Sequence, residues 1–296
     1  MELFNIALEC CTDAGRHLII FTFVFLVLTA GWACNPGMTW MRTAREAVTN
    51  LLYWFFMPVF SALVGPLAMA GTCWALGDHN PRLLPVASLP IWVQVAIIIV
   101  YQDIFCYWSH RLFHSRAAWK FHAIHHSPHD VDWITMARFH PVNLLEFVVL
   151  GVSIVVLGFS PVAILIPAPF NLAHSALVHA NLNWTFGPFR YVLASPVFHR
   201  WHHATEPEAI DKNYAATFPI LDILFGTYYM PEGKLPTEFG TVGEPLPEQF
   251  LDQMVYPFRR AETAKPQTIR RAGGVSPLMR PACQESFAAY EELERL

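Results

Sequence analysis

The sequence predicts an all-α integral membrane protein with a histidine-rich cap, and three observations lead to this fold class. Hydrophobic residues make up 54% of the 296 positions and charged residues only 14%, against about 25% charged in soluble domains. Four stretches long enough to cross a bilayer contain no Asp, Glu, Lys or Arg. The chain also has 14 histidines beside only 19 lysines and arginines. The net charge of −4 gives no indication of nucleic-acid binding.

The first three uncharged stretches each predict one membrane-spanning helix. They cover residues 17–41, 47–77 and 83–102, and a helix needs about 20 apolar residues to cross the hydrocarbon core. We place the spans near residues 18–36, 52–76 and 88–108. A cleaved signal peptide is not expected, because the first apolar run is too long for an h-region and acidic residues precede it.

The fourth uncharged stretch, residues 147–189, is too long for one helix and contains Pro161, Pro167 and Pro169. Its Gly158-Phe159-Ser160-Pro161 segment has the composition of a turn. We therefore predict a helical hairpin near residues 144–182, with one arm ending at about residue 158 and the other starting at about 162. A hairpin returns the chain to the membrane face it left, so histidines before and after it can meet.

Basic residues predict the orientation and, with composition, the domain boundaries. Loop 37–50 contains Arg42 and Arg45, and several basic residues follow the third span, so both segments are expected in the cytoplasm and the N-terminus outside. We expect one membrane-embedded domain, 1–230, with a histidine cap formed by 109–143 and 183–230. Residues 231–296 are expected to form a soluble tail, irregular at first and ending in a short amphipathic helix.

Three histidine clusters, which we call boxes, carry the chemistry. The first is HxxxH at His110 and His114, and the other two are HxxHH at His122, His125 and His126 and at His199, His202 and His203. Positions i, i+3 and i+4 share a helix face, so we expect the rings of one box to point at one metal centre. Neutral imidazoles without partners are costly at a membrane face, so their clustering indicates metal binding.

Further histidines and carboxylates are candidates around the boxes. His179 is expected to be a ligand at the end of the hairpin, while His140 and His174 are either ligands or neighbours that hydrogen-bond to ligands. Asp103, seven residues before His110, is the candidate that orients the first box. Other flanking groups have either this role or an ordinary polar role: Asp132, Asp211, Asn213 and Asp222.

The number of imidazoles predicts two ions. Eight or nine rings exceed the capacity of one ion, since four ligands satisfy a structural zinc. Imidazole suits Zn, Cu, Fe and Ni alike, so the ligand type does not select the element. We expect two iron ions in such a membrane-embedded site, with zinc as an ion that expression can load instead.

The boxes and their surroundings resemble the fatty acid hydroxylase / sterol desaturase superfamily. The resemblance runs from about Asp103 to Tyr229 and includes DxxxYWxHRxxH, FHxxHHS, RFHP, HAN, FHRxHH and DxNY…FGTYY. Asn143 departs from it, because many bacterial relatives have Glu there, and His174 is not part of the usual pattern. The segment looks more similar to bacterial members, so the bacterial inner membrane is the expected location.

The resemblance implies a di-iron enzyme that uses O2 and two external electrons to hydroxylate or desaturate a lipid, such as a sterol or fatty acyl chain. A ferredoxin or a cytochrome b5-type protein with its reductase is the expected electron donor, docking on Arg111, Lys120, Arg138 and Arg200. One alternative is cleavage of an ether lipid or hydroxylation of a lipid head group. The non-enzyme alternative is a metal transporter or storage protein, which would place ligands along a path through the bilayer.

Overall fold

The computed structural model describes residues 2–35, 44–76, 83–243 and 246–259, and all regular structure in these ranges is helical apart from two isolated β-bridges. The longer helices are α1 (Glu2–Trp32), α2 (Ala44–Leu76), α3 (Ile91–Phe113), α5 (Leu144–Leu157) and α7 (Ala168–His179). The short helices are α4 (Trp119–His122), α6 (Pro161–Leu165), α8 (Pro196–His202), α9 (Ile220–Leu224) and α10 (Phe250–Val255). The 3-10 turns are η1 (Pro85–Ser88), η2 (Trp133–Ala137), η3 (Pro141–Asn143), η4 (Gly187–Tyr191) and η5 (Tyr256–Phe258). The prediction of an all-α chain is confirmed.

Four helical segments are long and apolar enough to cross a membrane: Leu3–Trp32, Glu46–Thr72, Ile91–Phe113 and Pro161–His179. Large apolar side chains on these helices face outward, including Phe23, Leu67 and Trp92, each more than two-thirds exposed. A soluble monomer rarely exposes so much contiguous apolar surface, whereas lipid covers it at no cost. The helices are therefore those of a multi-pass membrane protein.

The predicted hairpin is present. α5 ends at Gly158, whose φ of +95° is the left-handed conformation that lets a helix stop and the chain reverse. Ser160 then caps α6 by accepting a hydrogen bond from the Ala163 amide. The return arm is divided into α6 and α7 at Pro167, since proline cannot donate the hydrogen bond that would continue a helix.

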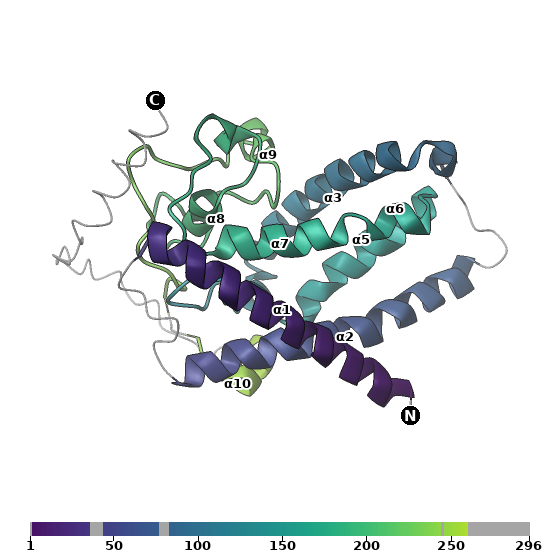
Figure 1. Cartoon of the computed structure of the whole chain (residues 1–296), viewed down its shortest axis with the longest axis horizontal. Coiled ribbons are helices and arrows are strands. Elements are labelled where there is room, and N and C mark those ends of the chain that lie inside the picture. Colours follow the sequence, from purple (N-terminus) through teal and green to yellow (C-terminus); the bar gives the residue numbers. More distant parts are fainter. Residues whose placement is uncertain (1, 36–43, 77–82, 244–245, 260–296) are drawn as a thin grey trace.

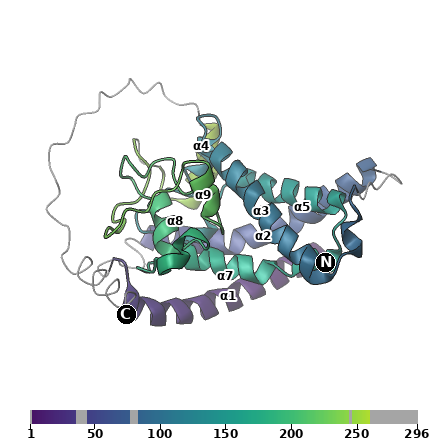
Figure 2. The same ribbon diagram turned by 90° about the horizontal axis from the view of Figure 1, so that it is seen from above.

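The long helices lie side by side, and the short helices gather at one of their ends. α1 packs along α2, α2 along α5, and α3 against α5 and α6. Figures 1 and 2 show α8 and α9 beyond one end of α3 and α7, on the side away from α6. The last turn of α1 is fixed there too, because Asn183 donates to the Trp32 carbonyl and Cys34 to the Asn181 carbonyl. This end of the bundle carries all three histidine boxes.

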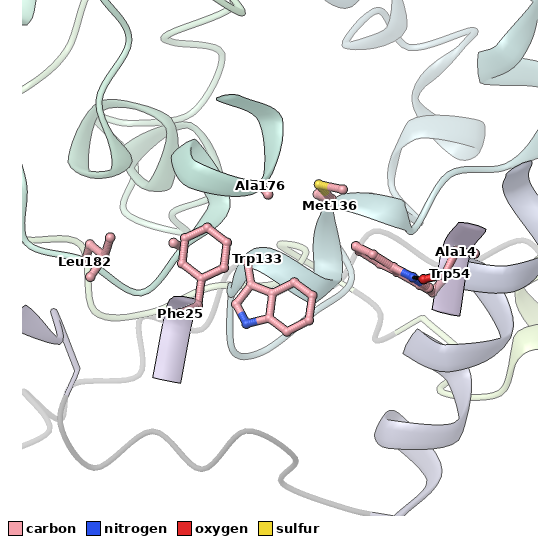
Figure 3. Close-up of a cluster of buried hydrophobic side chains, with 8 residues drawn as sticks. Ala14, Phe25, Trp54, Trp133, Met136, Ala176 and Leu182 are labelled. Carbon is pink, nitrogen blue, oxygen red and sulfur yellow. Dashed lines mark hydrogen bonds between the residues drawn. The ribbon is translucent and has the colours of Figure 1, made fainter. Parts of the chain in front are cut away.

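An aromatic cluster joins α1, α2, η2 and α7 (Figure 3). Trp54 and Trp133 meet edge to face with ring centroids 5.4 Å apart, and Phe25 stacks on Trp133 at 5.7 Å. Trp54 also donates from Nε1 to the Ala14 carbonyl at 2.8 Å. Truncating a buried aromatic of this size typically costs about 3–5 kcal/mol, so the cluster holds the end of α7 firmly in place.

Residues 246–259 pack on the membrane domain, whereas the sequence predicted a tail from residue 231. α10 contacts α2, η5 contacts α4, and Gln253 is buried. The Phe250 ring meets Tyr53 edge to face at 4.8 Å. The apolar side chains of α10 explain this packing. The part of the expected tail after residue 259, with its amphipathic helix, lies outside the described residues.

Candidate metal centre

Short helices and caps bring nine histidines to one place. His110 lies in the last turn of α3 and His114 is its C-cap. α4 ends at His122, and the turn after it carries His125 and His126. The remaining four come from the C-terminal turn of α7 (His179) and from α8 and its C-cap (His199, His202 and His203). Helix C-termini converge here, so these ligands come from four separate parts of the chain.

The nine rings form two groups. In each group, every ring contributes one nitrogen, and these nitrogens all lie within 4.8 Å of one another. Group A contains His110, His114, His122, His126 and His202, and group B contains His125, His179, His199 and His203. Two compact groups match the prediction of two ions. His140 and His174 belong to neither group.

Each HxxHH box divides between the groups, in contrast to the expectation that its three rings face one centre. His122 and His126 lie in group A and His125 in group B, while His202 lies in group A between two group B residues. A residue turns about 100° around a helix, so positions i and i+4 are only about 40° apart but i+3 and i+4 are about 100° apart. The HxxHH spacing thus supplies ligands to two neighbouring sites.

Hydrogen bonds fix which ring nitrogen faces the centre of each group. Five rings place Nδ1 next to an oxygen that can only accept, namely the carbonyls of Tyr214, Arg138, Ser175 and Lys212 and the Asp211 carboxylate. The rings are His110, His125, His179, His202 and His114. Since Nδ1 carries the proton, Nε2 presents a lone pair. Metal-binding histidines use this same arrangement to fix their tautomer.

The lone pairs face one another at distances that suit a bound cation. The Nε2 atoms of His110 and His122 are 3.0 Å apart, and that of His179 is 3.2 Å from His125 and 3.0 Å from His199. Ligands bound at about 2.0–2.1 Å to one ion lie roughly 3–3.4 Å from each other. In group A, the buried Nε2 atoms of His114 and His202 have no hydrogen-bond partner among the described residues. The residues present therefore fit two divalent ions.

Burial keeps these rings neutral, as metal ligands must be. Desolvation lowers the pKa of His122, His126 and His202 well below the ordinary value of 6.5, and neighbouring imidazoles lower it further. The pKa values of His125, His199 and His203 are lowered for the same reasons. The ring nitrogens that face one another in each group therefore carry lone pairs rather than protons.

A strained loop orients three rings of group A. Asp211 and Asn213 have φ of +59° and +58°, a left-handed conformation that is uncommon outside glycine. The loop presents the Asp211 carboxylate to His114 at 3.1 Å, the Lys212 carbonyl to His202 at 2.7 Å and the Tyr214 carbonyl to His110 at 2.9 Å. Backbone strain often accumulates at functional sites, and here it aims three acceptors at once.

Two other polar groups predicted near the site hold this loop. Asn213 donates to the carbonyls of Phe198 and Tyr229 and accepts from the Tyr229 amide. Asp222 accepts hydrogen bonds from the amides of Tyr214 and Ala215. Both residues therefore support the histidines through the backbone.

Asp103 does not orient the first box directly. Its carboxylate oxygens accept hydrogen bonds from the amides of Thr217 and Phe218 at 2.7 and 2.9 Å. Seven residues of helix correspond to a rise of about 10.5 Å, which is too far for contact with His110. Asp103 instead anchors the chain that follows Tyr214. Asp132 lies further away, where it caps η2 by accepting from the Trp133 amide.

The two remaining candidate ligands have other partners. His140 accepts a hydrogen bond from the Val142 amide at Nδ1 and donates from Nε2 to the Met254 carbonyl, so both ring nitrogens are engaged. His174 donates from Nε2 to the Ala194 carbonyl and stacks on Phe170. His140 thus helps to hold α10, and His174 lines the cavity described below.

Half of the predicted electron-donor surface is buried. Arg200 is fully buried, donates to the Val131 carbonyl and lies over the Phe239 ring. Arg138 is buried beside Glu46, to which it forms an ion pair at 3.3 Å. Both arginines are therefore structural, and the expectation that they dock a partner was wrong. Arg111 and Lys120 are exposed, as is Arg116.

A cavity of about 400 Å³ leads from the histidines between α3, α5 and α7. His110, His122 and His125 of the two groups line it, together with His179 and His199. Its apolar wall includes Phe139, Phe147, Leu150, Leu172 and Val178. A mostly apolar cavity beside a metal centre has the character of a substrate site.

The sequence profile of the fatty acid hydroxylase family matches residues 95–227. The matched segment begins in α3 and contains all nine histidines of groups A and B. This segment belongs to the fatty acid hydroxylase family. The resemblance drawn from the histidine boxes is confirmed.

Lipid-oxidising enzymes of several kinds are similar to this chain. The ornithine lipid hydroxylase OlsE of Rhizobium tropici is 27% identical over 83% of this chain and 78% of its own length. The alkylglycerol monooxygenases of Xenopus tropicalis and Homo sapiens are both 33% identical, over 77% and 53% of this chain. The chain spans 50% and 35% of those two relatives. No solved structure matches the chain.

These relatives support an oxidoreductase of the lipid hydroxylase and monooxygenase type in a membrane. Several groups around the histidine site were not predicted from the sequence. They are the carbonyls of Tyr214, Lys212 and Ser175 and the cavity residue Glu146. No side-chain pattern marks a carbonyl acceptor. Glu146 did leave a signal, because it is the only charged residue between Arg138 and Arg190.

Proposed function

We propose that this protein is a di-iron enzyme that uses O2 and external electrons to hydroxylate or desaturate a lipid. The observation that carries the proposal is the pair of histidine groups opening onto an apolar cavity between helices that can span a membrane. Two irons bound there would activate O2 for attack on a C–H bond. The family and the named activities of the relatives support this chemistry over simple metal storage.

The stoichiometry of the proposed reactions shows that the protein needs O2 and two electrons from outside. Hydroxylation consumes one C–H bond, one O2, two electrons and two protons, and gives one C–OH group and one water. Desaturation uses the same oxidant and electrons to remove two hydrogens, and gives a C=C bond and two waters. We therefore propose that an external protein supplies the two electrons, either a ferredoxin or a cytochrome b5-type protein with its reductase.

The chain's own residues prepare the reaction. The nine rings would hold the ions, and the carbonyl and carboxylate acceptors would fix ring orientation while the ions change charge. The apolar wall at Phe139 and Leu150 would hold the substrate and keep bulk water away. Asp103 would hold the cavity wall at Thr217.

Surface charge supports the proposed orientation. Arg111, Arg116 and Lys120 are exposed near the histidine end of α3, and the positive-inside bias favours this end in the cytoplasm and the N-terminus of α1 outside. The bacterial inner membrane is the proposed location. The same three residues form the remaining docking surface for an acidic electron donor.

Two other functions can be distinguished from the proposed one. Cleavage of an ether lipid or hydroxylation of a head group is the second candidate, supported by the alkylglycerol monooxygenase and ornithine lipid hydroxylase relatives. A transporter or storage protein is the non-enzyme candidate. Its ligands would line a route through the bilayer, whereas these histidines gather at one end of the helices.

The test uses iron-loaded protein in lipid nanodiscs, a chemical reductant, bacterial lipid extract and 18O2. We expect at least one lipid that gains a single 18O atom, or loses two hydrogens, with His17→Ala as an active control because His17 is exposed on α1. An unchanged lipid profile from a protein that retains two irons would contradict the oxygenase proposal and favour metal storage.

A further inference from the structure

Glu146 is the carboxylate that the proposed chemistry leaves without a role. It lies in the first turn of α5 and lines the cavity together with the histidines of both groups. Cys106 of α3 lines the same cavity. Glu146 belongs to neither histidine group. An ionisable residue in a mostly apolar cavity is a candidate for a functional role.

The cavity around Glu146 has no cation of its own. Its lining contains two carboxylates but no lysine or arginine, and Asp103 already uses both oxygens on the Thr217 and Phe218 amides. No ion pair to Glu146 occurs among the described residues. Gln102, Asn171 and Ser175 add neutral polar groups to the same wall. A plain hydrocarbon chain would leave this polar wall desolvated at a large cost.

Glu146 also lies close to the metal centre. Cys106 and His110, one turn apart near the end of α3, line the same cavity as Glu146. Asn143, one helical turn before Glu146, reaches within 3.5 Å of the His122 ring. Three residues of helix correspond to about 4.5 Å, so a group bound by Glu146 lies within a few bonds of a carbon placed at the metals.

We propose that Glu146 binds the ammonium group of the substrate, which is therefore an aminolipid oxidised within a few bonds of its amine. This inference rests on the proposed function and narrows it to hydroxylation in the polar head, with the balance of O2, electrons and protons given above. The carboxylate neutralises the ammonium charge, and neighbouring amide and hydroxyl oxygens accept its other protons. Glu146 is a specificity-determining residue and takes no part in ligation.

The test compares binding of two lipids that differ in one charge. The probes are an ornithine lipid and the same lipid with its free amine acetylated, added to metal-loaded protein in nanodiscs without O2 or reductant. A charge-assisted hydrogen bond predicts that the wild type binds the free amine about tenfold more tightly. In Glu146→Gln, the two lipids are expected to bind within about twofold of each other.

Three variants separate specificity from folding. Glu208→Gln makes the same change at an exposed site and should keep the wild-type preference. Glu146→Asp keeps the negative charge and should retain part of the preference for the free-amine lipid. In turnover, Glu146→Gln should raise KM for the free-amine lipid far more than it lowers kcat.

The outcomes are independent of the oxygenase test. Equal binding of both lipids by the wild type, or full preference in Glu146→Gln, would overturn the inference. So would loss of metal in Glu146→Gln, because that result would place Glu146 in the metal site. If protein with the expected preference instead fails to consume O2, the proposed function fails while the ammonium site stands.

Discussion

The Nε2 atoms of His125 and His179 lie 3.2 Å apart, yet neither ring can donate a proton to the other. Each donates from Nδ1 to a backbone carbonyl, that of Arg138 for His125 and that of Ser175 for His179. Two lone pairs at this distance repel each other unless a cation lies between them. A metal ion bound there, as proposed, would relieve this repulsion, and several predictions depend on that relationship.

Variants of the two groups should each lose one metal ion. His203→Ala removes a ligand of group B only, and His114→Ala a ligand of group A only. We expect metal content to fall from about two ions per chain to about one in each variant, because the other group is complete. Elemental analysis of purified protein checks this, with His17→Ala as the unchanged control. Loss of both ions from either variant would show a single cooperative site instead.

The Asp211 carboxylate should tune the affinity of group A. Asp211→Gly removes the acceptor for His114 while tolerating φ of +59°. Loss of such a partner typically weakens metal binding about 10–100-fold. Asp211→Asn keeps an oxygen acceptor and a residue that accepts this backbone conformation, so its loss should be smaller. Chelator competition on both variants measures the effect, and equal affinities for the wild type and Asp211→Gly would disprove the role.

The metal-free protein should become less stable on acidification. Burial lowers the folded pKa of His126, His202 and His203 below the unfolded value of 6.5. The unfolded chain therefore binds more protons below about pH 6.5, so the free energy of unfolding falls as pH falls. Each such histidine contributes about 1.4 kcal/mol per pH unit while the folded ring stays neutral.

The measurement for this effect is the midpoint of thermal unfolding of chelator-treated protein at pH 7.5 and 5.5. The metal-loaded protein is the control, since bound ions block protonation and stabilise the folded state. A midpoint for the metal-free protein that rises on acidification would mean that the rings are not held neutral.

The aromatic cluster should contribute strongly to stability. Trp54→Ala removes a buried ring and its bond to the Ala14 carbonyl, at an expected cost of about 3–5 kcal/mol. Trp54→Phe keeps most of the apolar contact and should cost less. Trp74→Ala is the matched control, because Trp74 lies on the same helix and is 86% exposed. Thermal unfolding in detergent ranks the three, and equal losses at positions 54 and 74 would contradict the packing described.

The boxes and the hairpin were predictable from sequence because spacing and charge alone determine them. A periodic histidine pattern gathers rings along one side of a helix, and an uncharged stretch too long for one helix, with a Gly158–Pro161 turn in it, predicts a reversal. The spacing also separates the i+3 and i+4 rings by about 100°, although the sequence prediction directed all three rings to one centre. Which rings of the two boxes share a group was not predictable, because it depends on how α4 and α8 face each other.

Partners that use the backbone were also beyond the sequence. Asp103 looked like an orienting group because only its helical phase was considered, whereas the axial rise separates it from His110. The carbonyls of Lys212 and Tyr214 fill that role. They are presented by a loop with residues of left-handed backbone conformation, which no residue pattern predicted. Arg138 and Arg200 looked like surface charges, yet carbonyl and carboxylate partners allow both to be buried.

The di-iron oxygenase proposal is tested by iron content and O2 uptake of purified protein, measured for the wild type beside His125→Ala with a chemical reductant. We expect about two irons per chain in the wild type and reductant-dependent O2 uptake. His125→Ala should lose the group B ion and the uptake. Fewer than two irons after reconstitution, or O2 uptake unchanged in the variant, would contradict the proposal.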